Sequence, residues 1–161
     1  MRKWIEGVAL LALGLQISIT LLAFFGPQQL PARIPIHFDV GGRPDGWGSS
    51  AMLLLLPAIT IINYLLFTVV TQFPGAFKYP VKVTSMNRLR MQSLALDMMA
   101  WMKLEIVGLL TWIQWVTIAT ARQPDKPIPA MTPAALVIVF ATVLFYIASM
   151  FRTGRESQRL L

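Results

Sequence analysis

Four long apolar segments alternate with shorter polar segments along the chain of 161 residues. Residues 7–26 and 51–73 contain no charged side chain. A helix of about 20 apolar residues is long enough to cross the hydrocarbon core of a bilayer. The pattern therefore predicts an all-α fold, a polytopic bundle of four transmembrane helices that forms a single membrane domain over residues 1–161. The predicted spans cover about residues 5–26, 51–73, 103–121 and 132–151.

The composition supports lipid as the main solvent of the fold. Apolar residues make up 56% of the chain and charged residues only 13%, against about 25% charged residues in ordinary soluble domains. We expect the bilayer, and beyond it a membrane-protein partner or a second copy, as partners. The net charge of +7 is explained by basic cytoplasmic loops, so a nucleic-acid partner is not expected.

Neither enzymatic chemistry nor a cofactor is indicated by the sequence. The chain has no cysteine, which excludes disulfides, thiolate metal sites and a cysteine nucleophile. It also contains no P-loop, dinucleotide fingerprint or Ser-His-Asp set. A haem would need an axial ligand, and the single histidine falls in a loop. We therefore predict a non-enzymatic protein without a cofactor.

The first apolar run could be a signal peptide instead of a span, because Arg2 and Lys3 precede it. The run is long for a signal peptide, and no small-residue cleavage site follows it. A retained span is favoured. With the N-terminus inside, ten basic residues fall in inner segments and four in outer loops. This bias predicts a multi-pass protein of the inner (cytoplasmic) membrane with both termini cytoplasmic.

Residues 77–103 are more basic than the runs on either side. Tyr79 precedes a proline and should be extended. Thr84 or Ser85 can cap a helix that begins near Met86. Apolar and charged residues mix along that helix, as in helices at the headgroup region. We expect a cytoplasmic interfacial helix that leads into the third span.

Residues 30–50 form the long polar passage between the first two spans, predicted to be a structured extracytoplasmic loop. Pro44-Asp45-Gly46 is typical of a turn, and Gly41-Gly42 permits a further bend. His37, Asp39 and Asp45 are a weak candidate for a divalent metal site, since such sites need three or four ligands. Two alternatives stay open: hydrogen bonds from these side chains order the loop, or His37 responds to pH.

Three charged residues fall within or beside the predicted spans: Glu6, Lys103 and Glu105. Ionisable groups inside a bilayer are costly and are functional candidates. Lys103 and Glu105 are two residues apart and cannot pair on one helix face. We expect Glu6 to pair with Lys103, and Arg2 or Lys3 to pair with Glu105. The polar residues of the spans are better suited to interhelical hydrogen bonds than to an ion path: Gln16, Asn63, Tyr64 and Gln114.

The loop has the pattern LP-x-x-I-P-x-HF, then a glycine and Pro-Asp-Gly. It resembles the bacterial membrane domain of unknown function at the N-terminus of Sdp toxin-immunity proteins, in a short stand-alone form. The resemblance extends over about residues 1–120. The residues that carry it in the loop are Leu30, Pro31, Ile34, Pro35, His37, Phe38, Gly42, Pro44, Asp45 and Gly46. Further along it includes Tyr79-Pro80-Val81 with Thr84, Asn87 and Arg88, and the stretch WMKLE at 101–105.

Three functions follow as hypotheses. The first is an immunity or envelope-stress protein whose loop at residues 30–50 recognises a ligand or partner outside the cell. The second is a small accessory subunit of a larger membrane complex. The third is an ion- or proton-handling protein that uses Glu105, Lys103 and His37.

Overall fold

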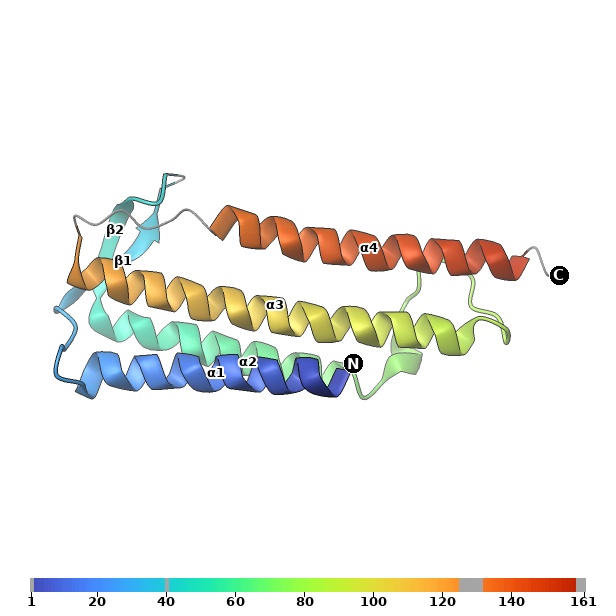
Figure 1. The fold of residues 1–161 in the computed structure, drawn as a ribbon, viewed down its shortest axis with the longest axis horizontal. Coiled ribbons are helices and arrows are strands. Elements are labelled where there is room, and N and C mark those ends of the chain that lie inside the picture. Colours follow the sequence, from blue (N-terminus) through green and yellow to red (C-terminus); the bar gives the residue numbers. More distant parts are fainter. Residues whose placement is uncertain (1, 40, 125–131, 159–161) are drawn as a thin grey trace.

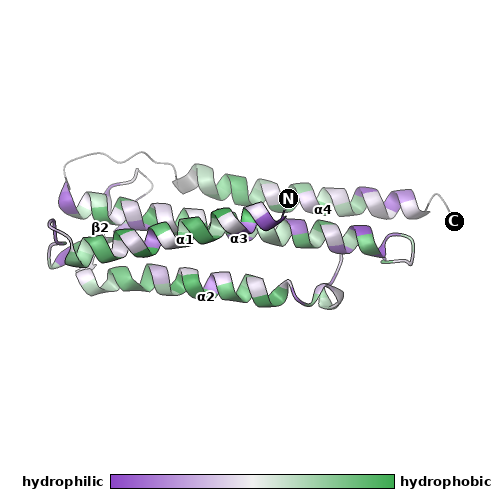
Figure 2. Cartoon of the chain, turned by 60° about the horizontal axis from the view of Figure 1, so that its bottom comes forward, coloured by the Kyte–Doolittle hydropathy of each residue, from purple (hydrophilic) through white to green (hydrophobic). Residues whose placement is uncertain are grey.

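The computed structural model describes residues 2–39, 41–124 and 132–158, and it contains four long helices (Figure 1). They are α1 (Arg2–Phe25), α2 (Leu55–Val70), α3 (Arg88–Arg122) and α4 (Thr132–Gln158). A short 3-10 helix, η1 (Ser50–Leu54), continues directly into α2. All four helical segments are long and apolar enough to cross a membrane, and hydrophobic residues predominate along them (Figure 2). The four predicted spans are confirmed in number, and they indicate a membrane protein.

Helix α3 is central to the bundle, because it contacts each of the other three helices. Helix α4 packs mainly on α3, on the side away from α1 and α2 (Figure 1). Helix α1 begins and α4 ends at one end of the bundle, the terminal end. The opposite end, where α1 and α3 end, carries a small β-sheet and is called the hairpin end (Figure 1).

The third helix begins earlier than the predicted span. It is continuous over 35 residues, a length of about 52 Å at the usual rise per residue, so the helix expected near Met86 and the third span form one helix. The predicted cap is wrong. Asn87 occupies the N-cap position, and its side-chain oxygen accepts a hydrogen bond from the Thr84 backbone N–H at 2.8 Å. Because the Thr84 amide is hydrogen-bonded within this local turn, the helix begins only at Arg88.

The loop between the first two spans is a β-hairpin, so the expected all-α fold is wrong at this point. Strand β1 (Arg33–Phe38) pairs with β2 (Pro44–Ser49) in antiparallel register. The predicted turn at residues 44–46 lies inside β2 instead. The chain reverses between the two strands, where the Arg43 backbone N–H donates to the Asp39 carboxylate at 2.8 Å. Gly42 has φ of 77°, a conformation open to glycine.

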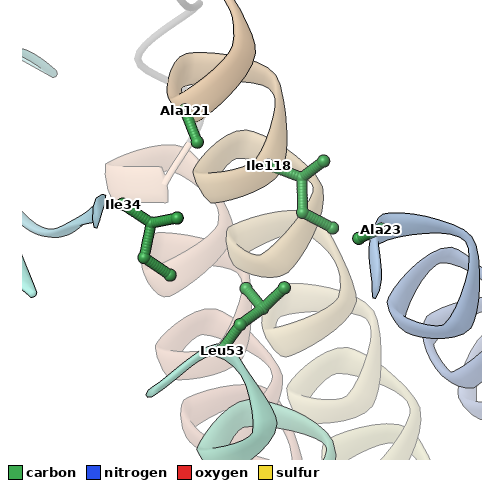
Figure 3. Close-up of a cluster of buried hydrophobic side chains, with 5 residues drawn as sticks. All are labelled: Ala23, Ile34, Leu53, Ile118 and Ala121. Atoms are coloured by element: carbon green, nitrogen blue, oxygen red, sulfur yellow. The ribbon is translucent and has the colours of Figure 1, made fainter. Parts of the chain in front are cut away.

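The hairpin is anchored to the bundle by one isoleucine. Ile34 of β1 is 1% exposed. It enters a buried apolar cluster at the hairpin end, formed with Ala23, Leu53, Ile118 and Ala121 (Figure 3). The cluster joins β1 to α1, η1 and α3. The next residue, Pro35, is also fully buried. The base of the hairpin is therefore part of the core.

Candidate functional site

The hairpin end presents the histidine that the sequence singles out. His37 Nδ1 contacts the Asp45 carboxylate across the two strands. The strand register shifts on both sides of His37, so that neither Ile36 nor Asp45 has a partner in the ladder. Such bulges re-aim side chains. The His37 and Asp45 side chains are 71% and 48% exposed, so this pair lies at the surface.

Asp39 does not join this pair, because its carboxylate is engaged in the turn with Arg43. Across residues 2–39, 41–124 and 132–158, no three His, Cys, Asp or Glu side chains come together as possible metal ligands. The weak metal candidate of His37, Asp39 and Asp45 is therefore not assembled. The alternative in which these side chains order the loop is consistent with their contacts.

Two glycines of β2 allow β1 to lie close across it. A Cβ atom at Gly46 would lie 3.0 Å from His37 Cβ, and one at Gly48 would lie 3.0 Å from Ile36 Cγ2. The hairpin also exposes two large apolar side chains, Ile36 at 47% and Trp47 at 39%. Its surface thus combines an exposed His–Asp pair with exposed apolar groups on a buried base.

A second polar site lies inside the bundle around Lys103, whose side chain is 4% exposed. The ammonium donates to both carboxylate oxygens of Glu6, at 2.9 and 2.8 Å, and to the Thr68 hydroxyl at 2.9 Å. It also lies 4.5 Å from the centre of the Tyr64 ring, and the Tyr64 hydroxyl donates to Glu6. The predicted Glu6–Lys103 pair is confirmed, and it joins α1, α2 and α3.

Glu105 faces α4 instead of the Glu6–Lys103 cluster. It accepts a hydrogen bond from the Thr142 hydroxyl at 2.6 Å. The predicted partners, Arg2 or Lys3, are wrong: Arg2 pairs with Asp97 at 3.1 Å. The reason is helical geometry, because residues two apart point to opposite sides of a helix. Lys103 faces α1 and α2, and Glu105 therefore faces α4.

A glutamine pair connects α1 and α3 nearer the hairpin end. Gln16 donates to Gln114 at 2.9 Å, and Gln114 donates to the Thr20 hydroxyl. Both glutamines are fully buried. This arrangement agrees with the prediction of interhelical hydrogen bonds. The prediction fails for Asn63, whose side-chain oxygen is buried and accepts no hydrogen bond within the described part of the chain.

At the terminal end, the loop before α3 fastens α4, a contact that sequence reasoning missed. Asn87 donates to the Ser157 hydroxyl of α4 at 3.0 Å. A Cβ atom at Gly154 would lie 3.0 Å from Val81, so a glycine permits this approach. Tyr79 donates to the Pro74 carbonyl at 2.9 Å, and burial raises the pKa of its phenol. In the sequence, the available signal for this contact was Gly154, a glycine within the polar last turns of α4.

Comparisons with known proteins place the hairpin in a recurring segment. Residues 12–61 match the family described as "Domain of unknown function (DUF1648)". An uncharacterized protein of Archaeoglobus fulgidus is 38% identical over 95 residues, which cover 52% of this chain and 51% of that protein. The chain thus matches about half the length of this curated relative. No solved structure matches the chain. The chain is similar to the DUF1648 domain over the part that runs from α1 through the hairpin into α2.

Proposed function

We propose that the chain is a non-enzymatic membrane protein of the immunity or envelope-stress type, in which the hairpin recognises a ligand or partner outside the cell. One observation carries this proposal: the base of the hairpin is buried in the bundle, while two large apolar side chains of the hairpin are exposed. Ile34 fixes the base within the core, while Ile36 and Trp47 remain exposed. Exposed apolar side chains on a rigid support are typical of recognition surfaces.

The orientation that the proposal needs is supported by the charge distribution. The start of α1, the end of α4 and the loop before α3 belong to the terminal end (Figure 1), and these segments contain most of the basic residues. The positive-inside rule assigns such an end to the cytoplasm. The hairpin then lies outside the cell. The hydrocarbon core is only about 30 Å thick, so the first part of α3 extends past it on the cytoplasmic side.

Single-cysteine labelling tests the orientation cleanly, because the native chain has no cysteine. Arg43→Cys is at the exposed hairpin turn, and Ser85→Cys is at an exposed position of the terminal end. A membrane-impermeant maleimide added to intact spheroplasts should label Arg43→Cys and should label Ser85→Cys only after permeabilisation. The reverse pattern would overturn the proposed orientation.

A survival assay tests the recognition role. Cells that express the chain are challenged with membrane-active peptide toxins and compared with cells that carry the empty vector. We expect protection by the wild type and its loss in the double variant Ile36→Ser/Trp47→Ser. Leu89→Ser is the matched control, because Leu89 is an exposed apolar residue of the terminal end. Equal protection by hairpin and control variants at equal membrane abundance would contradict a role of the hairpin surface.

The ion- and proton-handling alternative has weaker support. All three ammonium protons of Lys103 have acceptors, two on Glu6 and one on Thr68. A fully satisfied cation that joins three helices is suited to holding the bundle together.

A further inference from the structure

A pocket of about 410 Å³ lies between α3 and α4, at the middle of the bundle. Glu105 lines it, and this glutamate is the central residue of α3, with 17 residues on either side. Its other walls are aliphatic side chains of α4 and the aromatic rings of Trp101, Phe145 and Tyr146. Its volume falls within the range of about 300–1,000 Å³ that is typical of small-molecule sites.

Among the described residues, the carboxylate in this pocket has no counter-ion. The ion pairs of the described residues do not include Glu105, and no basic side chain lines the pocket. One oxygen accepts from Thr142. The other, Oε2, is buried without a hydrogen-bond partner among the described residues. A buried carboxylate without a counter-ion is costly, and a cation beside Glu105 would remove that cost.

The aromatic walls favour the same kind of ligand. Phe145 and Tyr146 of α4 are packed edge to face, with ring centres 5.3 Å apart, and Trp101 of α3 adds an indole. Aromatic faces attract cations, above all quaternary ammonium groups. The flank of the pocket is open towards the lipid, because Phe145 is 64% exposed and Ile138 is 57% exposed. A ligand that dissolves in the bilayer can therefore enter from the side.

We propose that the α3–α4 pocket binds a lipophilic organic cation, with its positive charge beside Glu105 and its apolar groups against Trp101, Phe145 and Tyr146. The site is independent of the hairpin, which lies at one end of the bundle (Figure 1). It is also separate from Lys103, whose charge is neutralised by Glu6 on the opposite side of α3.

Equilibrium dialysis with radiolabelled tetraphenylphosphonium tests the proposal on the full chain in detergent micelles. We expect saturable binding by the wild type. Glu105→Gln keeps an acceptor for Thr142 but removes the charge, and should lower the affinity roughly tenfold or more. Phe145→Ala removes one aromatic wall at an exposed position and should lower the affinity about threefold. Glu156→Gln is the matched control, because that side chain is exposed and pairs with Arg90 at the terminal end.

Tetraphenylborate, an anion of the same shape, separates charge recognition from simple partitioning. Dialysed alone, it should not bind saturably. Equal affinity of the wild type and Glu105→Gln for the cation, or saturable binding of the anion, would overturn the proposal. The proposal would also be overturned if the wild type bound no cation and Glu105→Gln changed the oligomeric state. That result would indicate that Glu105 pairs with a basic residue of a protein partner. If Glu105→Gln does not elute as a folded protein, unchanged binding by Phe145→Ala would overturn the proposal instead.

Discussion

Two of the ion pairs that join different elements have opposite surroundings. His37 and Asp45 meet on the hairpin with side chains 71% and 48% exposed. Lys103 and Glu6 meet within the bundle with side chains 4% and 37% exposed. An exposed pair contributes only about 0–1 kcal/mol to stability, whereas removal of one partner of a buried pair leaves an uncompensated charge. The two pairs therefore have different roles, the inner one structural and the outer one available for contacts.

The largest effect is expected from Lys103→Met. This change leaves the Glu6 carboxylate without its counter-ion and Thr68 without its donor. The free energy of unfolding should fall by about 3 kcal/mol, near the lower limit for broken buried pairs because Glu6 is partly exposed. The measurement is equilibrium unfolding in mixed micelles titrated with sodium dodecyl sulfate. The double variant Glu6→Gln/Lys103→Met should recover part of the loss, and an equal or greater loss would contradict this account.

An intermediate effect is expected from Ile34→Ala, which removes the anchor of the hairpin from its apolar cluster. Truncation of a buried isoleucine costs about 2 kcal/mol or more. Amide hydrogen exchange over residues 33–49 should accelerate more than exchange in α3. Ile36→Ala is the control, because Ile36 is 47% exposed and should leave exchange nearly unchanged. Similar acceleration in both variants would show that Ile34 is not a specific anchor.

The smallest effect is expected from His37→Ala. The exposed His37–Asp45 pair should contribute less than about 1 kcal/mol to the free energy of unfolding, and the variant should enter the membrane fraction normally. Asp45→Asn should give a similar loss, and the double variant should be no worse than either single change. A loss above about 2 kcal/mol would place the outer pair in the same structural class as the inner one.

The sequence was sufficient for the helical part of the fold. Runs of apolar residues define the spans because a bilayer requires a nearly continuous apolar surface. The pairing of Glu6 with Lys103 was also predictable, because each charge needs a partner at a similar depth. The partner of Glu105 was not predictable. Its contact with Thr142 depends on how α3 and α4 are rotated about their axes, which hydropathy does not specify.

The hairpin was not predictable for a related reason. Strand β2 consists of Pro-Asp-Gly-Trp-Gly-Ser, and most of these residues are depleted in strands. Local propensity indicates a turn there. The docking of Ile34 into the core and the closing of the turn by Asp39 favour strand pairing over that preference. Such long-range packing is invisible in a single sequence.

The separation of the inner pair along the chain has a consequence for biogenesis. Glu6 is synthesised 97 residues before Lys103. At usual translation speeds of about 5–20 residues per second, this interval lasts about 5–20 s. During that time α1 and α2 must enter the bilayer while the Glu6 carboxylate lacks its partner Lys103. The position of Glu6 in the first turns of α1 keeps it near the aqueous boundary until α3 arrives, so the arrival of α3 completes the three-helix unit.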